Sequence, residues 1–210
     1  MFLYRRCVCS FTAMVLVLLL PVVVQARPGE FDPTFGFRGR VRTEIVGADT
    51  AAPSALAVRP DGRIVIMGVV TQQGPPEVRK GLLAQYDTSG KLDASFGVSG
   101  IVTPLVDVLT GVSLLATGQL VVVGGNGGRS LVQRYTADGT LDTSFGVGGS
   151  TTVNFGEDDD GFTSVVVQAD GKIVAAGNSF ILGPSAVFSQ FALARFNADG
   201  SSTRPSVTPA

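Results

Sequence analysis

The side chains with the greatest capacity for chemistry lie in one acidic run, in which Glu157 is followed by Asp158, Asp159 and Asp160. Carboxylate oxygens are the hard ligands that Ca²⁺ prefers, so these three aspartates are the candidate calcium ligands of the chain. The spacing matches no calcium loop, however, and consecutive carboxylates before a glycine are typical of a solvated turn. We therefore expect no metal and no other cofactor, and keep calcium binding as the alternative.

Other catalytic chemistry finds little support. The 210 residues include no histidine, and the two cysteines, Cys7 and Cys9, both lie near the N-terminus. Serine–histidine triads, cysteine nucleophiles and the usual zinc sites are therefore not expected. Paired carboxylates could hydrolyse a glycoside, but no glutamate recurs at a fixed place and tryptophan, which stacks on sugars, is absent. We expect that the protein is not an enzyme.

The N-terminal segment is typical of a targeting signal. Arg5 and Arg6 precede an almost wholly apolar stretch, and Val24-Gln25-Ala26 then offers small or compact residues before Arg27. This order predicts a Sec-type signal peptide over residues 1–26, cleaved after Ala26, and a secreted or periplasmic protein. The apolar run is short for a bilayer, so we expect no membrane span after cleavage, with an uncleaved anchor as the alternative.

Composition bounds the remaining classes. A high glycine content and the abundance of Val among the apolar residues, with Ile beside it in the expected strands, favour β structure over helix. The formal net charge is −1, and Lys and Arg are scattered singly without a basic stripe. Nucleic acid is therefore not an expected partner.

One nonapeptide occurs three times and sets the organisation of the chain. It spans 31–39, 92–100 and 141–149, with the pattern Leu/Phe-Asp-x-Ser/Thr-Phe-Gly-x-x-Gly. The Asp can accept hydrogen bonds from the backbone two residues on, the Phe is a large apolar side chain to bury, and the glycines permit tight bends. We expect the nonapeptide to join one unit to the next through its buried Phe. The predicted structural residues are Asp32, Phe35, Gly36, Asp93, Phe96, Gly97, Asp142, Phe145 and Gly146.

A second pattern places a turn glycine, Gly62, Gly118 or Gly171, between two apolar runs. Such a glycine supplies the positive φ of a hairpin turn, so residues 55–58 should pair with 64–67, and 164–167 with 173–176. The second run of each pair is apolar throughout, which is typical of a strand buried on both faces. Another strand is expected at 82–86, 130–135 and 191–196, and one more before each hairpin at 40–43, 101–104 and 151–154.

These elements predict an all-β fold of tandem four-stranded antiparallel meanders, arranged as an incomplete β-propeller-like stack of three blades. We expect the domain over 27–200, with repeats at about 31–91, 92–140 and 141–200, and a disordered tail over 201–210. The connections at 72–80 and 178–190 absorb most of the difference in repeat length. They form a binding face in one interpretation and have drifted neutrally in length in the other.

Together the nonapeptide, the Pro-Asp-Gly-Arg-Ile-Val hairpin and the sequence Ala-Arg-Phe-Asn-Ala-Asp-Gly resemble the delta-60 repeat family over residues 31 to about 200. The resemblance implies a propeller-like secreted or surface bacterial protein without an established activity. The segment 86–92 also resembles a YD (RHS-type) repeat, but that motif usually recurs at a shorter period and lacks the Ser-Phe-Gly element.

The pattern breaks after Gly200, because Ser202 and Thr203 stand where Leu-Asp is required. Three blades are fewer than the roughly four to eight of closed propellers, and the open sheet edges invite self-association. A truncated chain, closure by oligomerisation and an open stack are the three alternatives. We expect a secreted, non-catalytic structural or interaction module with an unknown protein or glycan ligand. The alternative is a calcium-dependent carbohydrate-binding or glycan-processing protein.

Overall fold

The computed structural model describes residues 29–104, 106–155, 160–182 and 187–202. The predicted signal peptide with Cys7 and Cys9, two of the calcium candidates (Asp158 and Asp159) and positions 203–210 lie outside the described residues. In the described part every regular element is a β-strand, and no helix there is long and apolar enough to cross a membrane. This agrees with the all-β fold predicted from composition.

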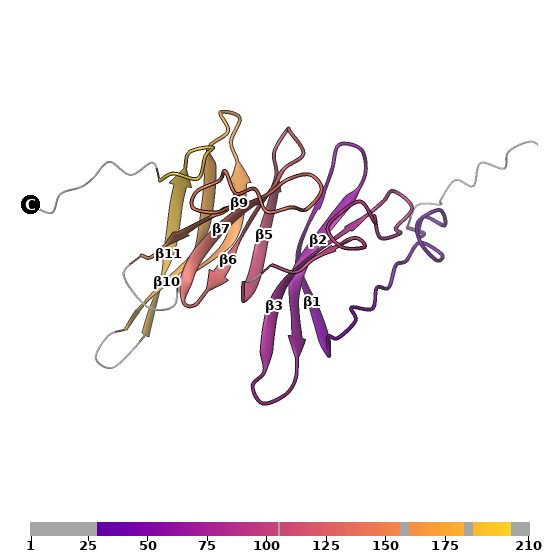
Figure 1. The fold of residues 1–210 in the computed structure, drawn as a ribbon, viewed down its shortest axis with the longest axis horizontal. Coiled ribbons are helices and arrows are strands. Elements are labelled where there is room, and N and C mark those ends of the chain that lie inside the picture. The colour runs from indigo at the N-terminus through magenta and orange to yellow at the C-terminus, as the bar shows by residue number, and fades with distance from the viewer. Residues whose placement is uncertain (1–28, 105, 156–159, 183–186, 203–210) are drawn as a thin grey trace, which may run out of the picture.

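The strands form three antiparallel sheets that follow one another along the stack in chain order (Figure 1). The first sheet holds β1 (Thr50–Val58), β2 (Ile64–Gln72), β3 (Val78–Tyr86) and β4 (Ile101–Val102). The second holds β5 (Val108–Leu114), β6 (Leu120–Asn126), β7 (Arg129–Tyr135) and β8 (Ser150–Val153). The third holds β9 (Gly161–Val167), β10 (Ile173–Leu182) and β11 (Val187–Phe196). The sheets have four, four and three strands in the described residues and do not close, as expected for an incomplete propeller-like stack.

The predicted hairpins are confirmed. Val58 pairs with Ile64 across the turn at Gly62, and Val167 pairs with Ile173 across the turn at Gly171. The turn glycines 62, 118 and 171 have φ of 84°, 83° and 81°, the left-handed region that only glycine adopts readily. Asp61 and Asp170 complete two of these turns by accepting the backbone N–H two residues on, from Arg63 and Lys172.

The short outer strands belong to a different sheet from the one predicted. Positions 101–104 and 151–154 were expected to open the unit that follows the nonapeptide. Instead Val102 pairs with Leu83 of β3 and Thr151 pairs with Val132 of β7, so each outer strand closes the sheet before it. The nonapeptide is thus an insertion between the third and fourth strands of one sheet, because its Gly-rich bend returns the chain to the edge it has just left.

The prediction of a strand at 40–43 is wrong. Arg40 forms only an isolated bridge, with Gly36, and positions 41–45 have no regular structure. The equivalent outer strands pair with the third strand of the sheet before them. No described residue ahead of the first nonapeptide provides such a strand for positions 40–43.

Two apolar layers hold the stack together. Between the first and second sheets, Val65, Met67 and Leu83 pack against Leu120 and Val122. Between the second and third, the opposite face of β6 packs against the third sheet through Val121 and Val123. Four of the first five residues of β6 are thus apolar and buried on both sides, as its continuous apolar run predicted.

Candidate functional site: the junctions between sheets

Each nonapeptide opens with a turn that its aspartate closes. The Oδ1 atom of Asp93 accepts hydrogen bonds from the backbone N–H of Ser95 at 3.0 Å and from its hydroxyl at 2.6 Å. Asp142 binds Ser144 in the same way, and Asp32 binds Thr34. The carboxylate thereby replaces the backbone partners that the turn leaves unpaired.

The Phe-Gly pair of each nonapeptide then contacts the next sheet. Phe96 is fully buried, and the N–H of Gly97 donates to the carbonyl of Asp138, in the turn after β7, at 2.7 Å. Gly146 donates to Asp199, in the turn after β11, at the same distance, and Phe145 beside it is also fully buried. The nonapeptide therefore joins its own sheet to the following one, although the next segment of the chain is still the outer strand of its own sheet.

The first copy makes the same contact from the N-terminal side. Gly36 donates to the carbonyl of Ser89, in the turn after β3, at 2.7 Å, and Phe35 lies half-buried beside Gly90. Glycine is required at the docking position in all three copies. At Gly36, Gly97 and Gly146 a Cβ would lie 2.3 Å from the backbone oxygen of Arg40, Ile101 and Ser150, and φ is 55–57°.

Two arginines strengthen the junctions, and sequence reasoning missed both. Arg59 is 4% exposed; its Nε donates to the side-chain oxygen of Gln85, and its Nη1 and Nη2 donate to the carbonyls of Gly118 and Ala137 in the second sheet's turns. Arg134 occupies the position of Gln85 one sheet later. Its Nε lies 2.7 Å from Oδ2 of Asp142, and its Nη1 donates to the carbonyl of Ala198 at 2.6 Å. Five fixed donors on a planar group suit this bridging between two turns.

A hydroxyl at the bulge of each first strand was also missed. Ser54 donates to the carbonyl of Leu109 in the next sheet at 2.7 Å, and Thr110 donates to the carbonyl of Phe162. Thr163 is the third member of the series, and its hydroxyl donates to the carbonyl of Ala176 in its own sheet. The signal was present in the sequence, because each hydroxyl lies eight positions before the hairpin glycine of its repeat, at 62, 118 and 171.

The recurring carboxylates are held as anions. The hydroxyl of Ser95 is the largest cause that lowers the pKa of Asp93, and the hydroxyl of Ser144 does the same for Asp142. The pKa of Asp61 and of Asp170 is lowered chiefly by the side chains of Arg63 and Lys172. An anion that already accepts several hydrogen bonds in a turn is a poor general acid, and in the nonapeptides these carboxylates serve as the acceptors that close the turns.

The acidic run is only partly described. Asp160 is buried, and its Oδ2 accepts the backbone N–H of Phe155 at 2.6 Å, whereas its Oδ1 is buried without a hydrogen-bond partner. Asp158 and Asp159 lie outside the described residues. Among the residues that are described, no group of three or more His, Cys, Asp or Glu side chains could hold a metal ion.

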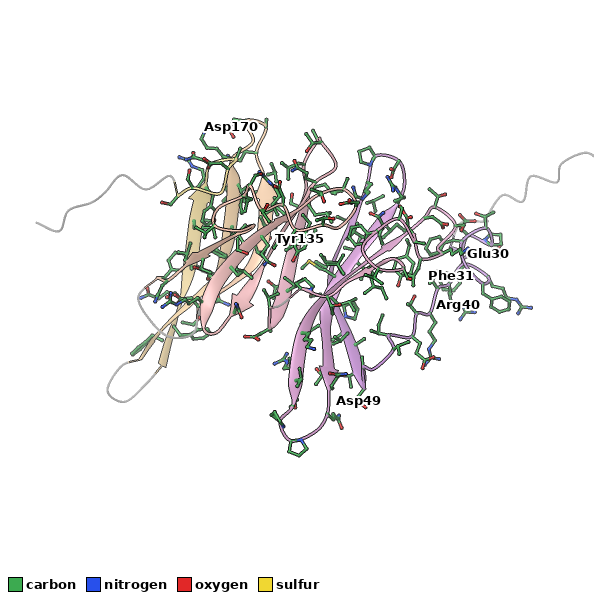
Figure 2. The ribbon with its side chains drawn as sticks, viewed as in Figure 1. Glu30, Phe31, Arg40, Asp49, Tyr135 and Asp170 are labelled. Carbon is green, nitrogen blue, oxygen red and sulfur yellow. The ribbon has the colours of Figure 1, made fainter. Side chains whose placement is uncertain are left out.

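An apolar hollow of about 360 Å³ lies on the face of the first sheet that points away from the second. The N-terminal segment walls it on one side through Phe35, Val41 and Ile45, and the sheet walls it on the other through Ile64 and Ile66. Figure 2 shows the start of this segment, at Phe31 and Arg40, at the end of the molecule opposite the third sheet. Aliphatic and aromatic walls of this kind suit the burial of other apolar side chains.

Comparison with known proteins agrees with the architecture. No curated protein matches the chain. The family model described as "Domain of unknown function (DUF5122) beta-propeller" matches residues 59–96, 114–145 and 168–202, which together make half of the chain. Each matched segment contains one hairpin glycine and one third strand with the turn that follows it, and the first two also contain a docking Phe. The chain therefore belongs to the DUF5122 beta-propeller family.

Proposed function

We propose that this chain is an exported, non-catalytic interaction module built from delta-60 repeats. The delta-60 assignment is supported by the nonapeptide, and export by the charged and apolar order of residues 1–26. A non-catalytic role is supported by the use made of the recurring aspartates. Asp32, Asp93 and Asp142 all serve as acceptors inside turns.

The observation that carries the interaction role is the unequal reach of the hairpins at one edge of the stack. The β2–β3 hairpin has strands of nine residues and the β10–β11 hairpin strands of ten, whereas β6 and β7 have seven each. The strands of both longer hairpins extend further toward the lower edge of Figure 1 than β6 and β7 do. Loops held out by a rigid scaffold are where binding residues concentrate.

An exposed aromatic side chain lies on one of these hairpins. Phe188, near the start of β11, is 58% exposed. Aromatic side chains contribute a large apolar surface at low entropic cost, and they dominate the energetics of binding surfaces. A protein or glycan ligand is therefore expected to contact residues 73–77 of the β2–β3 hairpin and the exposed Phe188 of the β10–β11 hairpin.

The binding test uses the full chain on a printed glycan array and against a random-peptide phage library. We expect a defined set of probes to bind the native protein. Phe188→Ser, or replacement of residues 73–77 by the two glycines that join β6 to β7, should abolish that binding without changing the thermal midpoint. Val147→Ser is the matched control, since it removes an exposed apolar side chain from another loop. Absence of binding to every probe, or release of a glycan product, would overturn the proposal.

The export test is separate. Expression with the native N-terminus should place the protein outside the cytoplasm, and mass spectrometry should find a mature chain that begins at Arg27. A cytoplasmic protein that retains residues 1–26 would contradict the exported state and leave the binding result to stand by itself.

A further inference from the structure

The two ends of the stack are the two halves of one inter-sheet junction. On the outer face of the first sheet, Leu56 and Val58 are 64% and 57% exposed. Their equivalents by strand register are Val112 and Leu114 on β5, which pack against the first sheet. The first sheet therefore presents the face that, in the second sheet, receives a preceding sheet.

The third sheet presents the opposite half. Leu193 of β11 pairs with Ala176 of β10. In the first and second sheets the equivalent pairs are Leu83 with Met67 and Val132 with Val123, so Leu193 is the counterpart of Leu83 and Val132. Leu83 and Val132 are fully buried by the sheet that follows each of them, whereas Leu193 is 68% exposed. Phe191 and Val166 are exposed as well. This outer face has the apolar character of a face that is covered by a following sheet.

The edges are complementary too. Positions 40–42 follow the first nonapeptide directly, as the outer strands β4 and β8 follow the second and third, yet they pair with no described strand. Among the described residues β11 has only β10 beside it, whereas β3 and β7 each carry an outer strand on that side. Within this part of the chain, one segment has no sheet to close and one sheet has no closing segment.

The hollow beside the first sheet completes the match. Ile45 lies as many positions after the docking glycine 36 as Val106 lies after the docking glycine 97. Ile45 is therefore the counterpart of Val106 at the next junction. At that next junction the space beside Val106 is filled by Met67 and Leu83 of the preceding sheet. At the first sheet it is open, with a volume of about 360 Å³.

We propose that two copies of this chain associate head to tail, the third sheet of each packing on the first sheet of the other. In each interface β11 of one copy pairs with positions 40–42 of the second, with Leu193 opposite Val41 and Ala194 opposite Arg40. This is the register of Leu83 with Val102 and of Ala84 with Ile101. Leu193 of one copy then fills the hollow beside Ile45 of the second.

The bulge hydroxyls support the same partner. Ser54 and Thr110 each donate to the first strand of the following sheet, at Leu109 and Phe162. In the head-to-tail pair the hydroxyl of Thr163 donates to the carbonyl of Pro53 of the second copy. Pro53 lies opposite Gly68 and is, in the first sheet, the counterpart of Leu109 and Phe162. Two copies related by a two-fold axis use both outer sheets of each stack and give six sheets, within the roughly four to eight of closed propellers.

Sedimentation velocity and native mass spectrometry of the full chain test the proposal. The expected species is a dimer. Leu193→Asp places a charge at the centre of both interfaces and should give a monomer, whereas Val147→Asp, on an exposed loop of the second sheet, should leave the dimer intact. A monomeric native protein, or a ladder of higher species that grows with concentration, would overturn the closed pair.

Cross-linking tests the register. In a Cys7→Ser and Cys9→Ser background, Val41→Cys with Leu193→Cys should yield a covalent dimer on oxidation, because directly opposite residues of an antiparallel pair have Cβ atoms about 4.5–5.5 Å apart. Val147→Cys with Leu193→Cys should yield none. Equal cross-linking by both pairs would overturn the proposed register. Phe188→Ser removes the proposed ligand contact and should not change the dimer, so the two proposals fail separately.

Discussion

Phe96 and Gly139 meet across the boundary between the first and second sheets. A Cβ on Gly139 would lie 2.9 Å from Cε2 of Phe96, closer than real Cβ atoms approach. The same relationship joins Phe145 to Gly200 at 2.9 Å and Phe35 to Gly90 at 3.1 Å. The Phe and the turn glycine therefore recur together for one reason. The Phe ring at each junction occupies the space that a side chain at the turn glycine would fill.

Gly139→Ala should destabilise the protein through two effects. The residue has φ of 86°, which strains an L-amino acid, and its new methyl group would press on Phe96 and Val102. Overpacking of a core typically costs about 1–3 kcal/mol, and we expect at least that loss in the free energy of unfolding measured by urea titration. Gly148→Ala is the control, since φ is 60° there but no atom lies within 4 Å. Equal losses in both variants would show that contact with Phe96 is unimportant.

Phe96→Ala should cost about 3–5 kcal/mol of unfolding free energy, as expected for a buried aromatic residue whose removal leaves a cavity. Phe35→Ala should cost less in the isolated chain, because Phe35 is only half-buried and none of the described strands lies ahead of it in the chain. The comparison is made from urea midpoints of the two variants. A larger loss for Phe35 than for Phe96 would contradict the assignment of Phe96 to the tighter junction.

The hairpins and the buried Phe positions could be predicted because they depend on local chemistry. A positive φ at Gly62 and a continuous apolar run over 64–67 fix a turn and a doubly covered strand within a dozen residues. The sheet to which Ile101–Val102 belongs could not be predicted in the same way. A two-residue strand carries no periodicity, and its pairing with Leu83 depends on how the nonapeptide bends the chain.

The arginines show a second limit. Arg59 and Arg134 perform the same bridging task from different positions in the repeat, so no alignment of the three copies places them together. Their equivalence is visible only in space, where each guanidinium reaches a turn carbonyl of the next sheet. The bulge hydroxyls differ, because Ser54, Thr110 and Thr163 keep a fixed offset and could have been found.

Arg59→Met should destabilise the first junction. The change retains much of the buried apolar volume but leaves the carbonyls of Gly118 and Ala137 without their charged donor. The change also removes the donor to the side-chain oxygen of Gln85, which is fully buried, and loss of the partner of a buried polar group costs about 1–3 kcal/mol, which thermal or urea unfolding would resolve. Arg79→Met, on an exposed residue of β3, is the matched control and should change little. A neutral Arg59→Met would mean that water satisfies those carbonyls.

Stability should fall in acid because of the nonapeptide aspartates. The pKa of Asp93 and of Asp142 is lowered in the fold, mainly by the hydroxyls of Ser95 and Ser144. A carboxyl group with a lowered pKa stabilises the folded state at pH values above its ordinary pKa, about 3.9 for Asp. That stabilisation is lost as the pH falls from there through the folded-state pKa, so the urea midpoint should decline steadily below about pH 4.

Replacement of the two serines tests this cause of the acid sensitivity. Ser95→Ala with Ser144→Ala should return both pKa values toward their ordinary range and make the decline below about pH 4 shallower. The variant should also be less stable than the native protein near neutral pH, because the stabilising hydrogen bonds to the two carboxylates are missing there. Ser189→Ala, on an exposed position of β11, should leave the whole profile unchanged. A double variant whose midpoint falls as steeply in acid as that of the native protein would assign the acid sensitivity to other carboxylates.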